Sequence, residues 1–398
     1  MIGGSMKMTS RFALAAAAGL LLGAAMTPAK AADLGGGCCA DLEERVAELE
    51  ATTARKGNRV VSLQVYGQVN KALLIFDDGV DSDAFVVDND ASGSRIGFTG
   101  SAKFKPGWSA GYLMELDIQD SASDKVTQDN DEGIENEIAI RYNYVYIESE
   151  TLGRISLGQA STAADGVNEV VLGNSLRNSD LHHGSSLEIQ GLGLQLKEIA
   201  ANLDGGRDDL IRYDSPSIYG FIVSASWGDD DYADIALRFK KEWNSIRVAA
   251  AVAYQWDSSN DSSPLDDFET LSGSVSVMHV PTGIYGAFAA GSREVENELR
   301  EDATFWYAQL GIEKKFLPYG STTIYAEYGE YDDVAANLGL AESSEATRWG
   351  LGIVQKIDSA AMELYAQAAF WDAEADFGEG VVTGEDLTTV MIGSRIKF

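Results

Sequence analysis

The sequence has little positive charge, few prolines and almost no cysteine. Only 30 of its 398 residues are Lys or Arg, against 62 Asp or Glu, so its formal net charge is −32. A protein that binds nucleic acid depends on a surplus of basic residues, which this chain lacks. No long apolar run follows residue 26 and the mean hydropathy is −0.12, which excludes a helical membrane protein. A hydrophobic share of 45% excludes disorder. What remains is a soluble protein or one that crosses a membrane with strands.

The first 31 residues have the pattern of a signal peptide. Lys7 and Arg11 precede an apolar stretch from Phe12 to Met26, and Ala29-Lys30-Ala31 provides small residues for a cleavage site. Fifteen apolar residues are too few to anchor a chain across a bilayer. We therefore expect an exported protein that begins at Ala32, with 27 basic and 62 acidic residues and a net charge of −35.

Residues 32–59 form a leader of different character. In residues 41–56, Leu42, Val46 and Leu49 follow a heptad spacing, which predicts a short coiled-coil helix. A helix this short is marginal alone, so we expect it to self-associate. Cys38 and Cys39 precede it in an oxidising compartment, where bridges between chains and unpaired thiols are both open alternatives.

From residue 60 to residue 398 the dominant period is two. In residues 60–76 one face carries Val65, Val69 and Leu73, while the other carries Gln68 and Asn70. Sixteen such stretches occur, at residues 60–76, 94–104, 108–119, 137–148, 154–159, 209–213, 221–228, 232–242, 246–256, 268–279, 284–294, 303–316, 321–331, 347–356, 361–374 and 387–398. This leaves about 21 residues per strand and connection, enough for the roughly 9–11 residues of a strand that crosses a membrane.

The connections favour a barrel over a soluble sandwich. Short turns at 105–107, 149–153, 214–219, 243–245, 280–283, 317–320 and 357–360 interleave with longer polar segments at 77–93, 120–136, 257–267, 332–346 and 375–386. Short turns at one rim and long loops at the other are typical of outer-membrane barrels. Pro106, Pro216, Pro281 and Pro318 all fall in the tight connections, where no ladder donor is lost.

Aromatic residues near the ends of apolar faces indicate a lipid–water boundary, with core packing as the alternative for each. They are Tyr142, Tyr144, Tyr146, Tyr254, Trp256, Trp349 and Phe370. The fold class predicted from these patterns is all-β, a 16-stranded antiparallel transmembrane barrel over residues 60–398.

Five segments resemble the general trimeric porins of Gram-negative bacteria. They are SRIGFTG at 94–100, RYNYVYIES at 141–149, GRISLGQ at 153–159, IRYDSPSIYGF at 211–221 and a last strand that ends in Phe398. The leader before VYGQVN at 65–70 looks most like the alphaproteobacterial, Rhizobiales-type branch. The resemblance implies a homotrimer in the outer membrane, in contact with lipid and lipopolysaccharide. Each copy would hold a water-filled channel for small hydrophilic solutes, without a cofactor. It also implies that Phe398 is a recognition signal for the barrel-assembly machinery.

The resemblance further implies that the loop after the fifth strand narrows the channel. Asp165, Glu169 and Asp180 in that loop are the candidates for the acidic side of the constriction. Candidates for the basic wall are Arg95, Arg141, Arg212 and Lys103. Each lies at one of the alternating polar positions of its predicted strand, which face the lumen. Facing charges of this kind set up a transverse field. The alternative is that these arginines only neutralise nearby carboxylates.

The first two long loops are crowded with carboxylates. Their members are Asp77, Asp78, Asp81, Asp83, Asp88, Asp90, Asp120, Asp124, Asp129, Asp131 and Glu132. Such a mouth concentrates cations, so we predict weak cation selectivity. Carboxylates that only solvate the loops, or that hold divalent ions bridging lipopolysaccharide, are alternatives compatible with it. A mature start at Ala32-Asp33 matches related barrels attached to peptidoglycan, which suggests a tether at Ala32.

Three rival functions remain open. An enzyme has little support, because only His182, His183 and His279 could act as imidazole bases and no HExxH motif occurs. The GxSxG match at residues 107–111 leads from a turn into the predicted strand 108–119 and not into the helix of a nucleophile elbow. No metal site is expected from them. A substrate-specific channel of the sugar type could use aromatic residues inside the barrel as a stacking surface. The candidates are Tyr285, Tyr325, Tyr365 and Trp371, for which a place in the aromatic girdle is the alternative. An adhesin or structural barrel predicts no conductance.

Overall fold

The structure is a computed structural model that describes residues 60–131, 137–175, 184–229, 231–258, 267–297 and 300–398. The expected signal peptide, the leader with its helix, and Asp180 lie outside these residues. No helix in the described ranges is long and apolar enough to cross a membrane.

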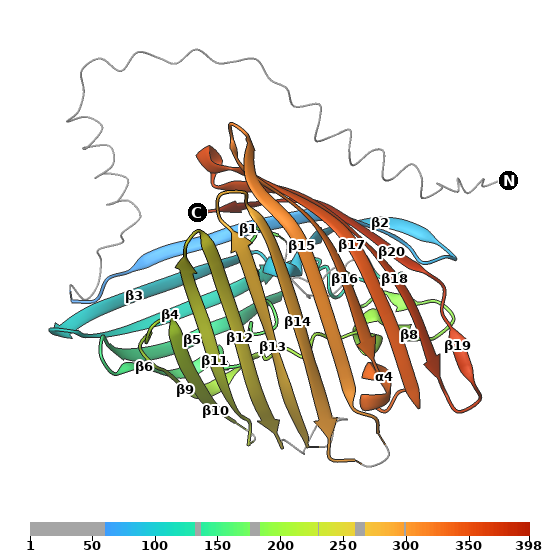
Figure 1. The fold of residues 1–398 in the computed structure, drawn as a ribbon, viewed down its shortest axis with the longest axis horizontal. Coiled ribbons are helices and arrows are strands. Elements are labelled where there is room, and N and C mark those ends of the chain that lie inside the picture. Colours follow the sequence, from blue (N-terminus) through green and yellow to red (C-terminus); the bar gives the residue numbers. More distant parts are fainter. Residues whose placement is uncertain (1–59, 132–136, 176–183, 230, 259–266, 298–299) are drawn as a thin grey trace.

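Sixteen strands of the described chain form one closed antiparallel β-barrel (Figure 1). They are β1 (Gln64–Asp77), β3 (Arg95–Lys105), β4 (Trp108–Gln119), β5 (Glu137–Ser149), β6 (Gly153–Ser161), β9 (Arg207–Asp214), β10 (Phe221–Gly228), β11 (Ala233–Trp243), β12 (Ile246–Asp257), β13 (Phe268–His279), β14 (Ile284–Val295), β15 (Ala303–Leu317), β16 (Gly320–Asp332), β17 (Ser343–Ile357), β18 (Met362–Asp376) and β20 (Leu387–Lys397). Each coincides with one of the sixteen predicted stretches, which confirms the fold class.

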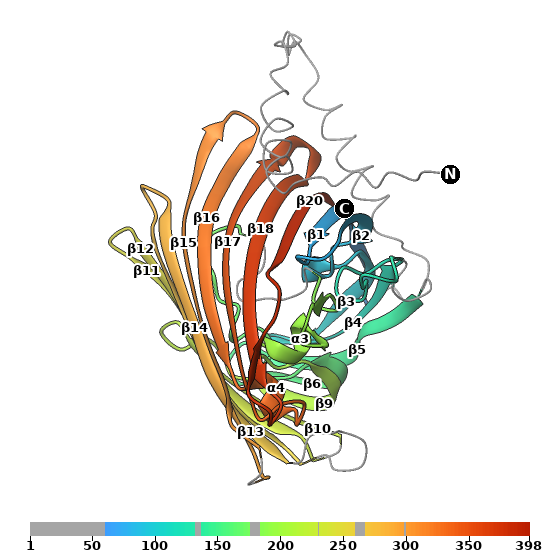
Figure 2. The same cartoon turned by 90° about the vertical axis from the view of Figure 1, so that its right-hand side faces the viewer.

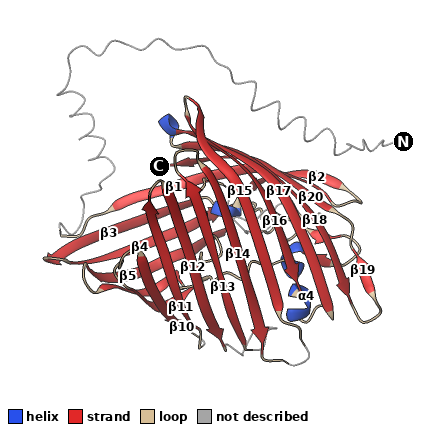
Figure 3. Cartoon of the chain, in the orientation of Figure 1, coloured by secondary structure: helices blue, strands red, loops and turns tan. Residues whose placement is uncertain are grey.

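The barrel closes where the first strand meets the last. β1 pairs with β20 from Gln68↔Lys397 to Asp77↔Thr388, and its earlier residues pair with β3. Every neighbouring pair is antiparallel, and because β1 and β20 close the sheet, the sixteen strands of the described chain leave no free edge along the main wall. Strand dominates the described chain in Figure 3, as full pairing of backbone groups inside a bilayer requires.

Side chains alternate between the two faces of the wall. On β1, Val65, Val69 and Leu73 are exposed on the outer face, while Gln68 and Asn70 are buried on the inner face. The same alternation gives β10, β11 and β18 an apolar outer face, as the sequence predicts. An apolar outer surface suits lipid, and a polar inner surface suits water.

The two rims differ as predicted. Tight connections join β3 to β4, β5 to β6 and each later hairpin at the rim that holds the C-terminus (Figure 1). The turn residues Pro106, Pro281 and Pro318 all lie between strands there. The opposite rim carries the long connections and the short helix α4 (Val334–Asn337).

Some residues predicted as loops are ordered elements. β2 (Ser82–Asp88) pairs with β1 from Lys71↔Asp88 to Asp77↔Ser82, and β19 (Val381–Thr383) extends β18. In β2 the apolar alternation is short, with Phe85 and Val87 as its only buried apolar residues, and Asp83 and Asp88 flank it. Two-residue strands β7 (Glu188–Ile189) and β8 (Leu194–Gln195) and the helix α3 (Leu196–Ile199) lie between β6 and β9.

The prediction for the β5 tyrosines was wrong. Glu115 pairs with Tyr142 but Leu116 pairs with Ile140, so Arg141 is an extra residue in a β-bulge. A bulge reverses the alternation that follows it. Tyr142, Tyr144 and Tyr146 therefore share the face of Glu115, which is the inner face, whereas Val145 and Ile147 point outward. The outer face does carry the predicted pairs Tyr254–Trp256 and Trp349–Phe370, whose ring centroids are 4.6 and 4.1 Å apart.

Candidate functional site

The connection between β6 and β9 enters the barrel with its described residues 162–175 and 184–206, and we call it the inner loop. Its first part is fixed to inward-facing side chains of strands far along the chain. The backbone N–H groups of Ala163, Val170 and Leu172 donate to the hydroxyl oxygens of Ser226, Ser274 and Ser276 at 3.0, 3.1 and 3.1 Å. The N–H of Asn174 donates to Glu313 at 2.9 Å. Small polar residues on β10 and β13 thus let loop backbone lie directly against the wall.

The second part of the inner loop covers the wall on the side of β14 to β20. Leu187, Ile189, Leu196 and Ile199 are at most 1% exposed and belong to one apolar cluster with inward-facing aromatic residues. Figure 2 shows α3 between the β16–β20 wall and the β3–β5 wall. Apolar burial of this size holds the loop in place without a disulfide.

This packing contradicts a prediction about stacking surfaces. The inward-facing rings Tyr285, Tyr325, Tyr365 and Trp371 are only 1–3% exposed, because the inner loop and its neighbours cover them. They are neither girdle residues nor a surface for solutes. The inner loop also contacts β9–β11 through Arg212, Ser226 and Arg238, so the open part of the lumen lies toward β3–β5.

On β3–β5 the predicted basic residues Arg95 and Arg141 meet two carboxylates. The Nε atom of Arg141 lies 3.0 Å from Oε1 of Glu115, and its Nη1 lies 3.4 Å from Oδ2 of Asp117. Arg95 lies 3.8 Å from the same Glu115 oxygen, and the Tyr66 hydroxyl donates to Glu115 at 2.7 Å. The two arginines are therefore brought together, but around wall carboxylates rather than alone. This geometry supports the alternative in which they neutralise nearby acids.

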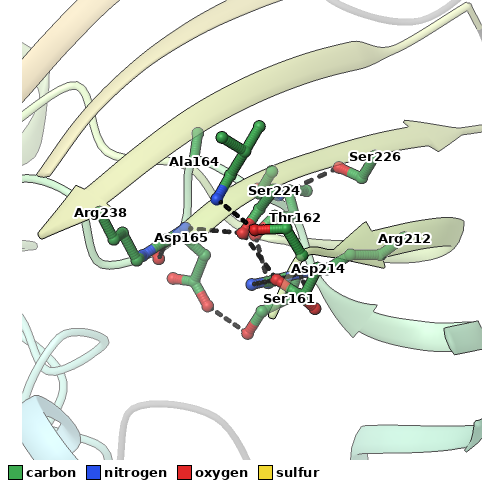
Figure 4. A network of polar contacts seen from close by, with 12 residues as sticks. Ser161, Thr162, Ala164, Asp165, Arg212, Asp214, Ser224, Ser226 and Arg238 are labelled. Atoms are coloured by element: carbon green, nitrogen blue, oxygen red, sulfur yellow. Dashed lines mark hydrogen bonds and ion pairs between the residues drawn. The ribbon is translucent and has the colours of Figure 1, made fainter. Parts of the chain in front are cut away.

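Arg212 and Asp165 belong to a second charged cluster at the root of the inner loop (Figure 4). Arg212 donates to both carboxylate oxygens of Asp214 and, through Nη1, to the Ser161 carbonyl at 3.0 Å. Arg238 donates to the backbone carbonyl of Asp165 at 2.9 Å, and the Ser161 hydroxyl donates to the Asp165 carboxylate. The predicted acid and base are thus neighbours here, and the contacts also fix where the loop leaves the wall.

The remaining predicted residues are not in these clusters. Lys103 is exposed and lies eight residues from Arg95 on β3, which at about 3.4 Å per residue is about 27 Å away. It is therefore at the short-turn rim and not at the same constriction. Glu169 lies in the first part of the inner loop and is partly buried.

The predictions missed the acids of the wall and a row of tyrosines. Glu115 and Asp117 lie at the alternating polar positions of residues 108–119, so the alternation alone could have identified them as inward-facing residues. Tyr142, Tyr144 and Tyr146 follow one another along β5 with ring centroids 6.2 and 6.5 Å apart, and all three are partly exposed. The guanidinium of Arg154 lies 4.0 Å from the Tyr146 centroid. We call these three residues the tyrosine row.

Several carboxylates of the long loops have local structural roles. Oδ1 of Asp78 accepts hydrogen bonds from the N–H groups of Val80 and Asp81, at 3.1 and 2.7 Å, and so closes the β1–β2 turn. Asp88 and Asp120 both pair with Lys71. The Lys71 ammonium lowers the pKa of the Asp120 carboxyl, mainly by hydrogen bonding. Part of the acidic mouth thus stabilises the loops that carry it.

The C-terminal residue helps to close the barrel. The N–H and carbonyl of Phe398 exchange hydrogen bonds with Gly67 at 3.0 and 2.9 Å. Phe398 as a whole is 65% exposed, and its ring lies over the Cα of Gly67, where a β-carbon would come within 2.6 Å of the ring.

Comparison with known proteins agrees with this architecture. A family model for Gram-negative porins matches residues 13–376. The chain belongs to the Gram-negative porin family. It is an outer-membrane protein of a family of channels, and the sixteen-stranded barrel agrees with this. No curated protein sequence matches it.

Solved porin structures share the fold at low identity. The anion-selective porin from Comamonas acidovorans has a TM-score of 0.59 and 17% identity, covering 85% of this chain and 100% of its own. The trimer form of OmpT from Vibrio cholerae has a TM-score of 0.56 and 16% identity, covering 85% and 100%. The channel DcaP of Acinetobacter baumannii has a TM-score of 0.55 and 12% identity, covering 86% and 99%. At these identities the likeness concerns the fold alone.

Proposed function

We propose that this porin is a water-filled channel for the passive diffusion of small hydrophilic solutes and ions. The observation that carries the proposal is the polar and charged inner face of β3–β5, where the rings of Tyr142, Tyr144 and Tyr146 stay partly exposed while the inner loop lies against β9–β13. A barrel of sixteen strands is wide enough for an aqueous lumen. Water there keeps permeating ions hydrated, so the cost of crossing hydrocarbon is avoided.

We propose that the channel weakly favours cations. The acidic loops attract cations at the mouth. In the wall, Glu115 and Asp214 compensate Arg95, Arg141 and Arg212, so these arginines impose little anion preference. Reversal potentials across planar bilayers in a KCl gradient test this at low salt, where screening is weakest. The expected sign is cationic, and an anion preference would overturn it.

We propose that three copies assemble into a homotrimer. The apolar outer face and the trimer form of one structural relative support this assembly. Single-channel recordings of purified protein should show three equal closing steps per insertion. Isolated single steps at every insertion would contradict the trimer.

The tyrosine row favours a second candidate, a substrate-specific channel of the sugar type. Partly exposed rings in sequence along the lumen offer stacking surface to a solute that travels past them. Liposome swelling with a panel of sugars separates the two functions. A smooth decline of rate with solute mass supports the general channel, whereas saturation by one sugar supports the specific one.

A further inference from the structure

A cavity of about 200 Å³ lies between the end of the inner loop and the inner face of β12–β14. Leu203 to Gly206 of the loop form one side, and Gln255, Asp257, Phe268 and Arg293 belong to the strands on the other. All four strand residues share the inward face, because Gln255 and Asp257 pair with Thr270 and Phe268, and Thr270 pairs with Arg293. The cavity is therefore part of the lumen, near the long-loop rim, and borders the charged cluster at the root of the inner loop, because its lining residue Gly205 lies against Asp165 and Thr162.

Arg293 lines this cavity with its guanidinium. Its guanidinium forms neither a hydrogen bond nor an ion pair with any residue that the structure describes, and its Nε atom is shielded from solvent. The contact that it does make is with the ring of Phe268, whose centroid is 5.5 Å away. By contrast, Arg95, Arg141, Arg212 and Arg348 all have carboxylate partners. A shielded cation without an anion is costly, so the site is suited to receive an anion from the solution.

Two carboxylates also line the cavity. Asp204 belongs to the loop side, where it accepts hydrogen bonds from the N–H groups of Gly166 and Asn168 at 2.6 and 3.1 Å. Asp257 ends β12. The Tyr232 hydroxyl, bonded to Gln255 at 3.2 Å, supplies a further polar edge. A simple anion would meet the guanidinium but also both acids, whereas a solute with a positive end would satisfy both signs.

We propose that this cavity is a binding subsite for an α-amino acid in its zwitterionic form. The carboxylate pairs with the Arg293 guanidinium, whose two parallel donors match a carboxylate. The ammonium lies toward Asp257 and Asp204, and an apolar side chain packs against the Phe268 ring. The proposal rests on the proposed channel function, because solutes reach the cavity through the lumen.

The test compares three ligands of one shape on the full-length mature protein folded in detergent. L-Phenylalanine carries both charges, 3-phenylpropanoate only the carboxylate, and phenethylamine only the ammonium. Binding is followed by saturation-transfer NMR and equilibrium dialysis. We expect phenylalanine to bind more tightly than either relative. Arg293→Gln should weaken phenylalanine about tenfold, because a charge-assisted hydrogen bond is lost. Arg247→Gln is the matched control, since Arg247 also belongs to β12–β14 but pairs with Glu242.

Asp257→Asn provides an independent variant if Arg293→Gln does not fold. It should weaken phenylalanine, which loses the partner of its ammonium, and should not weaken 3-phenylpropanoate, whose carboxylate loses a repelling charge. Equal binding of all three ligands, or undiminished phenylalanine binding in either folded variant, would overturn the proposal. Single-channel conductance of the same preparations is measured in parallel. Normal conductance without phenylalanine binding removes the subsite and leaves the channel, whereas absent conductance in the wild type removes the channel function itself.

Discussion

Removing the charge of Glu115 should shift the channel toward anions. Glu115 is the shared partner of two arginines, since Arg141 lies 3.0 Å and Arg95 3.8 Å from the same carboxylate oxygen. In Glu115→Gln the shape of the side chain is kept, but one negative charge of the inner wall disappears. Arg141 retains Asp117, whereas Arg95 loses the carboxylate that compensates it.

Coulomb's law bounds the effect. A unit charge acts on an ion about 7 Å away in water with about 0.6 kcal/mol. At 0.1 M salt, screening over a Debye length of about 10 Å reduces this to about 0.3 kcal/mol. Because cations and anions respond with opposite sign, the difference between them changes by about 0.6 kcal/mol. The ratio of cation to anion permeability should therefore fall roughly two- to threefold.

Reversal potentials in a KCl gradient across a planar bilayer measure this ratio directly. The matched control is Glu269→Gln, because Glu269 lies on β13 with the opposite parity and its carboxylate contacts the Tyr254 hydroxyl outside the lumen. The control should leave the ratio unchanged. The shift for Glu115→Gln should shrink at 1 M salt, where the Debye length is about 3 Å. A ratio that stays constant, or one that moves toward cations, refutes the assignment of Glu115 to the permeation path.

Three further predictions concern stability and assembly. Arg348→Met should lower the stability of the folded protein by about 3–5 kcal/mol, because it leaves the fully buried Glu327 carboxylate without its cation. An unchanged urea midpoint in lipid vesicles would contradict this. Phe398→Ala should slow the appearance of folded barrel in the outer membrane, as judged by its heat-modifiable band, whereas Phe377→Ala in a loop should not; equal rates would exclude an assembly role. Muramidase digests of sacculi should release a peptide that begins at Ala32, and its absence would exclude the tether.

The strands could be predicted from the sequence because apolar and polar residues alternate within each strand of a membrane barrel. Each strand has one face toward lipid and one toward water, so its period of two is visible without knowledge of its neighbours. Pro106, Pro281 and Pro318 then mark the turns, since proline cannot donate to a ladder. The short strands β2 and β19 were not predicted. Each pairs with one long strand, β1 or β18, within an acidic loop, and each is too short to show a clear apolar alternation.

The site was predicted less completely, because charge pairing depends on register. The alternation of side chains along a strand correctly assigns Arg95 and Arg212 to the inner face. It does not tell which residue of the next strand lies opposite each of them. Arg95 stands beside Asp117, a pairing set by the irregular register between Lys103 and Lys105. If the pairing were extended regularly from the turn at Pro106-Gly107, without this shift, Arg95 would be placed opposite Ile118 and not opposite Asp117. The inner-loop contacts with Ser274 and Ser276 span 104 residues and leave no local signal at all.

The bulge at Arg141 connects the error in the sequence interpretation to the function. Without the extra residue, unbroken alternation would place Tyr142, Tyr144 and Tyr146 on the same face as Ile140, in contact with lipid. With it, the tyrosines enter the lumen, and Arg141 reaches both Glu115 and Asp117. One inserted residue thus changes the face of half a strand, as a period of two requires. Arg141 is therefore the reason why the prediction for the β5 tyrosines was wrong. It is also the reason why β5 presents aromatic rings to the lumen, on which the proposal of a substrate-specific channel depends.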